Sequence, residues 1–315
     1  MSELGRRQLL AGLGASLFAC RRTPVPVEAD PPPVPPIPVH LAPDGGAEPL
    51  GFVRRELALP GTASPRTIVL EPRVPAGSTE KFPVVIALHG RGEARRGPSR
   101  GPQGWPDDYA LELALDRIAH PPLDRDDFFG LVTPAELAAH NEALKHQPYR
   151  GVVVLCPYVP DLDLASRAAQ DEYGRFLVDV LLPRARETAP ILHGRAHTGI
   201  DGISLGGEVA LHVGAGFAEA FGAVGGMQPA IQSKDAREWA ERLVAAKARA
   251  GALAVHLLTS TGDPFRKPTR RLSEELDKAG FLHRFEETPG PHDYVYNRGP
   301  AAYGMLSFHD RALRP

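Results

Sequence analysis

The sequence has only two cysteines, Cys20 and Cys156, among its 315 residues. A disulfide framework is therefore not the source of its stability. It contains no run of ~20 apolar residues, which excludes a protein with several membrane-spanning helices. Its formal net charge of −2 lacks the positive excess of a protein that binds nucleic acid through a basic surface. What remains is ordinary globular composition, with 43% hydrophobic and 23% charged residues.

Residues 1–20 have the pattern of an export signal. Two arginines precede an apolar stretch at 9–19, which is too short to span a bilayer but suits a signal peptide. Cys20 follows Leu-Phe-Ala, and this resembles the bacterial lipobox, whose cysteine is lipidated. The paired arginines also resemble a twin-arginine export signal. We expect a lipoprotein of the bacterial cell envelope, periplasmic or in the outer membrane, anchored at Cys20. An ordinary cleaved signal or a buried helix is the alternative.

Residues 21–50 are rich in proline. Proline lacks a backbone N–H and cannot continue a helix or a central strand. A polyproline II segment extends ~3 Å per residue and acts as a semi-rigid spacer. We interpret 21–50 as a linker between the anchor and a domain at 51–315. A ligand for a proline-binding module is the alternative.

The remainder alternates between strand and helix patterns. Residues 82–88 and 151–156 are continuous apolar runs, as expected of strands buried on both faces. The predicted strands are 52–59, 67–72, 82–88, 151–156, 197–202, 221–227, 253–259 and 281–287. The predicted helices are 170–187, 205–215, 235–249, 268–279 and 300–312. This alternation predicts an α/β fold with a mostly parallel central sheet covered by helices on both faces.

Residues 91–150 separate two of the central strands and form an insertion. Helices are predicted within it at 109–120 and 134–146. Long segments of this kind are often functional. The insertion is either a lid or wall of a substrate pocket, or a surface elaboration without contact to substrate.

Residues 202–206 have the pattern G-x-S-x-G between a predicted strand and a predicted helix. A serine on such a strained turn exposes its hydroxyl, and small residues two positions away let the chain turn tightly. The helix that starts at Leu205 also directs its N-terminal amides towards the site, which favours negative charge. We therefore predict Ser204 as a nucleophile.

A second glycine-rich segment, His89-Gly90-Arg91-Gly92, follows the buried run at 82–88. Its glycines allow the backbone to curve over the nucleophile. We expect the backbone amides of Arg91 and Leu205 to form an oxyanion hole. For the His89 side chain, a structural role in holding this loop is preferred.

Asp263 and His292 follow the predicted strands 253–259 and 281–287. Both are thus expected at the sheet edge where Ser204 lies. Their order along the chain, Ser then Asp then His, is the order of α/β-hydrolase triads. Asp293 is a competing acid, but its adjacency to His292 makes the required geometry difficult.

These motifs resemble the α/β-hydrolase superfamily, and within it the putative-esterase group that includes esterase D-like and enterochelin-esterase-like proteins. The resemblance rests on residues 88–90, 202–207, 216–221, 262–263 and 289–293. Ile203, Leu205 and Pro291 depart from residues common in that group. The resemblance implies a serine esterase with the triad Ser204, Asp263 and His292 and an acyl-enzyme intermediate. It implies a small-molecule ester substrate, no cofactor and no metal.

Two alternatives from other classes stay open. One is an acyltransferase or a serine peptidase of the same fold, which would change the acceptor or the bond that is attacked. The other is a non-catalytic binding protein on a hydrolase scaffold. For the esterase, His292 must be neutral to act as a base, so activity should fall below about pH 6 to 7. The oligomeric state is not predicted.

Overall fold

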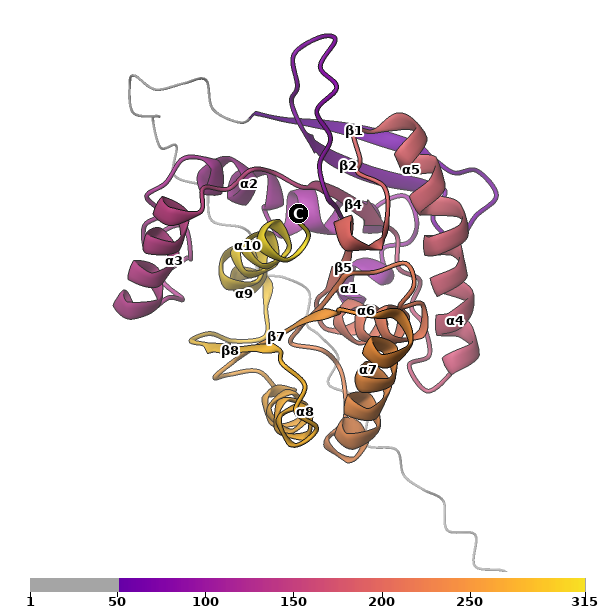
Figure 1. Cartoon of the computed structure of the whole chain (residues 1–315), viewed down its shortest axis with the longest axis vertical. Coiled ribbons are helices and arrows are strands. Elements are labelled where there is room, and N and C mark those ends of the chain that lie inside the picture. The colour runs from indigo at the N-terminus through magenta and orange to yellow at the C-terminus, as the bar shows by residue number, and fades with distance from the viewer. Residues whose placement is uncertain (1–50, 315) are drawn as a thin grey trace, which may run out of the picture. The chain divides into compact units, whose positions relative to one another are not determined.

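The computed structural model describes residues 51–314, so the predicted signal, Cys20 and the whole predicted linker at 21–50 lie outside the described residues. Eight strands form one sheet in the order β1-β2-β4-β3-β5-β6-β7-β8 (Figure 1). The strands are β1 Phe52–Ala58, β2 Arg66–Pro72, β3 Val84–Leu88, β4 Val153–Pro157, β5 Thr198–Gly202, β6 Ala223–Met227, β7 Ala254–Ser260 and β8 Arg284–Thr288. All eight predicted strands are present, with ends shifted by up to three residues.

The sheet is antiparallel at one end and parallel over the rest. β1 pairs with β2 and β2 with β4 in antiparallel register, whereas β4, β3, β5, β6, β7 and β8 run parallel. The predicted mostly parallel α/β fold is confirmed. From β3 the chain adds β4 on one side and β5 on the other. In open α/β sheets, ligands bind at such a reversal of strand order, beside the carboxyl ends of the strands.

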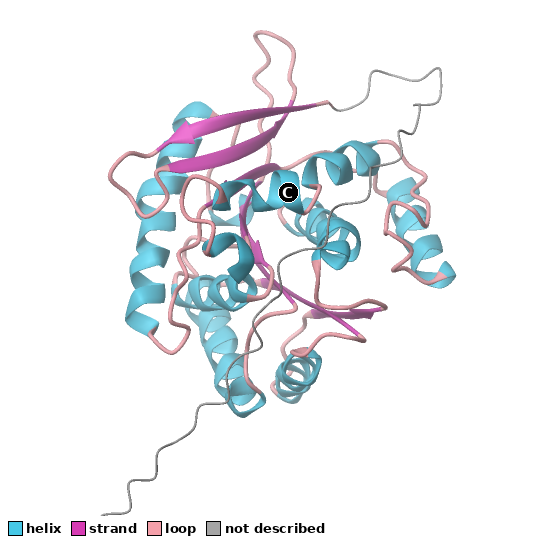
Figure 2. Ribbon diagram, turned by 180° about the vertical axis from the view of Figure 1, so that it is seen from behind, coloured by secondary structure: helices cyan, strands magenta, loops and turns pink. Residues whose placement is uncertain are grey.

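Helices cover both faces of the sheet. The helices are α1 Arg91–Ala94, α2 Leu111–Ala119, α3 Pro134–His146, α4 Arg167–Arg175, α5 Leu182–Thr188, α6 Leu205–Gly216, α7 Ala236–Ala250, α8 Arg266–Lys278, α9 Tyr294–Tyr296 and α10 Ala302–Ala312. Figures 1 and 2 show α4 to α7 on one side of the sheet and α2, α3 and α10 on the other. Two separate hydrophobic clusters match this division.

The helix predicted at 170–187 is one helical run made of three parts. α4 begins after Ser166, whose hydroxyl accepts a hydrogen bond from the Ala169 amide at 3.3 Å. A π-helical segment at 176–181 then joins α4 to α5. The last predicted helix likewise begins with a π-helical segment at 297–301, before α10.

The insertion supplies part of the second core. Trp105, Leu111 and Leu115 are buried in the same cluster as Tyr303 and Leu306 of α10. α3 begins as predicted at Pro134, after a capping box in which the Thr133 and Glu136 side chains each accept a hydrogen bond from the other residue's backbone amide. The insertion therefore covers part of the sheet face on which α10 also packs.

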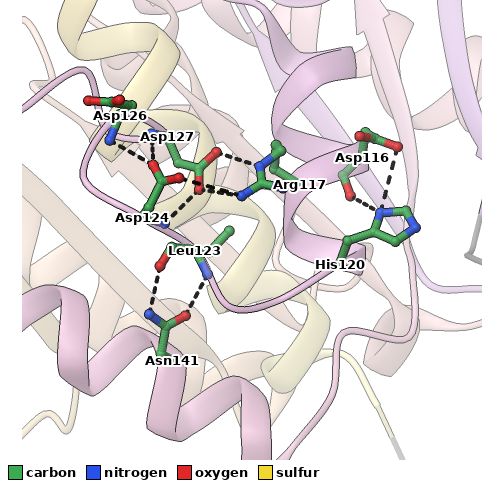
Figure 3. A network of polar contacts seen from close by, with 8 residues as sticks. All are labelled: Asp116, Arg117, His120, Leu123, Asp124, Asp126, Asp127 and Asn141. Carbon is green, nitrogen blue, oxygen red and sulfur yellow. Dashed lines mark hydrogen bonds and ion pairs between the residues drawn. The ribbon is translucent and has the colours of Figure 1, made fainter. Parts of the chain in front are cut away.

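Polar contacts hold the segment between α2 and α3 (Figure 3). The Arg117 guanidinium donates to both carboxylate oxygens of Asp127, at 2.7 and 3.1 Å. Asn141 of α3 accepts from the Leu123 amide at 2.7 Å and donates to the Leu123 carbonyl at 2.8 Å. This segment is thus tied to both helices. Within residues 51–314, no helix is both long and apolar enough to cross a membrane.

Candidate active site

Ser204 lies at the turn from β5 into α6, with φ 56° and ψ −117°. This left-handed conformation is strained for a residue with a side chain. A Cβ at Gly202 would lie 2.4 Å from the Gly206 carbonyl oxygen. A Cβ at Gly206 would lie 2.4 Å from the Leu88 carbonyl oxygen. Both glycines of the motif are therefore required by the close approach of β5, α6 and β3.

The structure brings Ser204, His292 and Asp263 together in one line. The Ser204 Oγ lies 3.1 Å from the His292 Nε2, and the His292 Nδ1 lies 2.9 Å from the Asp263 Oδ1. Ser204 is 8% exposed and Asp263 is 6% exposed. The three residues follow β5, β7 and β8, as the sequence patterns predict. This geometry allows His292 to accept the Ser204 proton while Asp263 holds the imidazole.

Asp263 is fixed by two further hydrogen bonds. Its Oδ2 accepts from the Thr259 hydroxyl at 2.6 Å, and its Oδ1 accepts from the Phe265 amide at 2.9 Å. Asp293, the competing acid, instead caps α9 and accepts from the amides of residues 295 and 296. Its carboxylate is thereby engaged by backbone, and Asp263 alone of the two contacts the His292 ring.

His89 has a structural role, as its sequence context indicates. Its Nε2 accepts from the Val159 amide at 2.9 Å, which leaves Nδ1 to donate to the Gly90 carbonyl at 2.9 Å. Burial lowers the pKa of His89 to about 4, so the ring is neutral at physiological pH. The histidine thereby ties the loop after β3 to the loop after β4.

The two amides expected to form an oxyanion hole are each the first residue of a helix. Arg91 begins α1 and Leu205 begins α6. First-turn amides lack an acceptor within their own helix. The Gly90 amide is different, because it donates to the Tyr109 hydroxyl at 3.1 Å. A Cβ at Gly90 would lie 3.8 Å from the Ser204 Cβ, so this loop passes directly beside the nucleophile.

Gln228 supports the histidine loop and was not expected from the sequence. It is fully buried after β6, with φ 43°. Its Nε2 donates to the Pro291 carbonyl at 3.0 Å and to the Ser260 hydroxyl at 2.7 Å. It thereby holds the residue that precedes His292. No motif surrounds Gln228, and its only local signal is a polar residue directly after a small-residue strand.

Glu208 lies in the first turn of α6 and is 7% exposed. Its carboxyl forms no hydrogen bond or ion pair with any group in residues 51–314. Burial raises its pKa to about 8, helped by Asp235 and opposed by three arginines, Arg91, Arg167 and Arg242. At neutral pH this carboxyl is therefore mostly protonated.

The described residues contain no group of three or more side chains suited to hold a metal ion. Cys156 is buried in β4, where burial raises the pKa of its thiol. The His197 Nδ1 donates to the Leu313 carbonyl at 2.9 Å. The predicted packing role of Cys156 is confirmed. The polar side chains positioned for a reaction are those around Ser204.

A parallel sheet with a nucleophile turn after β5 and an Asp–His pair after β7 and β8 defines an α/β-hydrolase. Residues 64–299 match the model of the family described as "Putative esterase". Because the match covers most of the chain, this protein belongs to that family. It is a serine hydrolase of the carboxylic-ester class.

Solved structures of esterases share the fold at low sequence identity. A ferulic acid esterase aligns with a TM-score of 0.59 and 17% identity, over 84% of this chain and 99% of its own. The S-formylglutathione hydrolase FrmB of Staphylococcus aureus aligns with a TM-score of 0.57 and 14% identity, over 86% and 100%. The enterobactin esterase of Shigella flexneri aligns with a TM-score of 0.53 and 16% identity, over 82% and 60%. No curated protein matches the sequence significantly.

Proposed function

We propose that this protein hydrolyses small-molecule carboxylic esters through an acyl-enzyme on Ser204. Its Oγ attacks the ester carbonyl while the His292 Nε2 takes the proton and passes it to the leaving alcohol. Water then attacks the acyl-enzyme by the reverse route. Asp263 holds the tautomer in which Nδ1 carries a proton. The observation that carries the proposal is the Ser204–His292–Asp263 line at 3.1 and 2.9 Å.

The amides of Arg91 and Leu205 would stabilise the oxyanion. Both stand at helix N-termini, where the helix dipole favours negative charge. Loss of one such donor typically costs ~3 kcal/mol of transition-state stabilisation. The loop containing Gly90 passes beside Ser204, which supports a role for the next amide, that of Arg91, in binding the oxyanion.

We also propose that the enzyme is exported and held at the cell envelope by a lipid on Cys20. The support is the arginine pair, the apolar stretch and the lipobox-like sequence in residues 1–20. A proline-rich linker at 21–50 would hold the catalytic domain away from the membrane. Metabolic labelling with a palmitate analogue tests this, and Cys20→Ala should abolish both the label and the membrane fraction.

A fluorophosphonate probe and a panel of nitrophenyl acetate, butyrate and octanoate test the catalytic proposal. We expect an adduct on Ser204, and Ser204→Ala should lower kcat by about 10⁴-fold or more. Methyl ferulate belongs in the panel because a ferulic acid esterase shares the fold.

A second Ser–His pair in the structure provides a matched control. The Ser273 hydroxyl lies 2.7 Å from the His283 Nε2, on α8 and away from the triad. Ser273→Ala should keep both the adduct and the turnover. A folded wild-type protein with neither adduct nor turnover would contradict the proposal and favour a binding protein. Ester transfer to an added alcohol in preference to water would indicate an acyltransferase.

A further inference from the structure

A buried carboxylate lies directly behind the loop that carries the Arg91 amide. Glu93 of α1 is 1% exposed. The Tyr294 hydroxyl donates to its Oε1 at 2.5 Å, and the Tyr109 hydroxyl donates to its Oε2. The Tyr109 and Tyr294 rings meet edge to face, with centroids 5.7 Å apart. A buried carboxylate is costly unless donors satisfy it, and here two hydroxyls do so.

The three side chains come from two segments that are far apart in the sequence. Glu93 and Tyr109 lie 16 residues apart within the insertion, and Tyr294 stands two residues after His292. A Cβ at Gly104 would lie 2.6 Å from the Glu93 Cγ, so the insertion backbone is closed against the carboxylate as well. The network therefore joins the loop with the expected oxyanion amide to the loop with the catalytic histidine.

The Tyr109 hydroxyl makes a second contact that reaches the expected oxyanion hole. It accepts a hydrogen bond from the Gly90 amide at 3.1 Å while it donates to Glu93. The orientation of the His89–Gly90 peptide, one residue before the Arg91 amide, is thus set by a side chain whose own position is set by Glu93. On the other side, a Cβ at Gly92 would lie 3.0 Å from the Tyr294 hydroxyl. The Arg96 guanidinium donates to that hydroxyl at 3.3 Å and to Asp108 at 2.7 Å.

We propose that Glu93, Tyr109 and Tyr294 are positioning residues for the esterase reaction. The carboxylate and its two tyrosines hold the Arg91 amide and His292 in fixed places on either side of Ser204. This inference rests on the proposed function, and it assigns the insertion a role in catalysis through Tyr109. None of the three side chains touches the ester in this proposal, and all three act through the backbone of the two loops.

Tyrosine-to-phenylalanine variants test the proposal with little change in volume. Tyr109→Phe removes the acceptor of the Gly90 amide, and Tyr294→Phe removes one donor to Glu93. Because a small misplacement of reacting groups can cost about 100-fold, we expect kcat to fall about 10- to 100-fold for Tyr109→Phe. A smaller fall, about 5- to 20-fold, is expected for Tyr294→Phe. KM should stay within about twofold in both, since neither residue binds substrate.

The rate of fluorophosphonate labelling gives a readout that loss of stability alone would not move. The phosphonyl oxygen occupies the same oxyanion hole, so labelling of folded Tyr109→Phe should slow by a factor similar to that in kcat. In the double variant the two losses should be less than multiplicative, because both act through one carboxylate. Glu93→Gln keeps the shape and one acceptor oxygen, and should retain more activity than Glu93→Ala.

Tyr173→Phe is the matched control. Tyr173 is also a buried tyrosine, and its hydroxyl donates to the Tyr158 carbonyl at 2.9 Å, outside the Glu93 network. It should lose a comparable amount of thermal stability but keep kcat within about twofold. The proposal is wrong if folded Tyr109→Phe and Tyr294→Phe keep wild-type kcat and labelling rates. An unlabelled, inactive wild type would instead overturn the proposed function itself.

Discussion

Glu93 and Glu208 are both buried glutamates in the first turn of a helix beside Ser204, yet their surroundings differ. Glu93 accepts hydrogen bonds from two tyrosine hydroxyls. Glu208 has neither hydrogen bond nor ion pair within residues 51–314, and burial raises its pKa to about 8. Both helix dipoles favour a negative charge, by about 0.3–1 kcal/mol.

Glu208 shows that a place in the first turn of a helix does not by itself keep a buried carboxyl ionised. For Glu208 the cost of desolvation exceeds the attraction of the α6 N-terminus and of the three nearby arginines. For Glu93, the insertion and the histidine loop each bring one hydroxyl. The first turn of α1 is therefore held by fixed hydrogen bonds to Glu93. The first turn of α6 instead carries Glu208, an acid that can titrate near physiological pH.

Removal of the Glu93 carboxylate should have the largest effect on stability. Glu93→Ala leaves two buried tyrosine hydroxyls without their acceptor and opens a small cavity, so we expect a loss of about 3 kcal/mol in the free energy of unfolding. Urea denaturation at pH 7 measures it. Glu238→Ala, at an exposed glutamate in the first turn of α7, should change that free energy by no more than about 0.5 kcal/mol. Equal losses in the free energy of unfolding for Glu93→Ala and Glu238→Ala would show that the buried contacts of Glu93 add no stability.

Substitution of Glu208 should instead raise the free energy of unfolding, by an amount that depends on pH. Between about pH 4.5 and 8 the folded protein keeps a proton on Glu208 that the unfolded chain has released, so stability falls as pH rises through this range. Glu208→Gln removes this dependence. We expect the variant to be more stable than wild type by on the order of 2 kcal/mol at pH 9, with little difference at pH 4.

Parallel denaturation curves of wild type and Glu208→Gln at pH 4, 7 and 9 measure that difference. A difference that stays constant across the three pH values would show that the carboxyl does not titrate as its surroundings indicate. Glu93→Gln in the same series should show no comparable gain at pH 9, because it replaces a carboxyl that accepts from two tyrosine hydroxyls.

The smallest expected effect is on the alkaline side of the rate profile. Ionised Glu208 would add a negative charge near the N-terminus of α6, whose Leu205 amide faces the developing oxyanion in the proposed mechanism. Wild-type kcat should therefore decline by about threefold between pH 7.5 and 9, because ionised Glu208 modestly repels the developing oxyanion. Glu208→Gln should show a flatter profile over the same range. A matching decline in both proteins would assign the alkaline limb to another group.

Much of the fold follows from local patterns. The buried apolar runs predict β3 and β4, and the G-x-S-x-G spacing predicts the turn at Ser204, because two glycines are needed where three backbones approach closely. Asp263 and His292 could be named because parallel strands end at one sheet edge. The contacts of Gln228 and the two partners of Glu93 could not, since they join segments whose separation in sequence carries no periodic signal.

Local sequence patterns were enough to predict the α/β class, the order of nucleophile, acid and base along the chain, and the residues at each turn. These features depend on hydrophobic periodicity and local backbone sterics, which act over a few neighbouring residues. The packing of distant segments, by contrast, shows that the insertion supplies part of the second core and reaches Gly90 through Tyr109. It also shows that, among residues 51–314, the Glu93 carboxyl meets two hydroxyl donors and the Glu208 carboxyl meets none. Such pairings depend on how distant segments fold against each other, and burial then amplifies their electrostatic consequences.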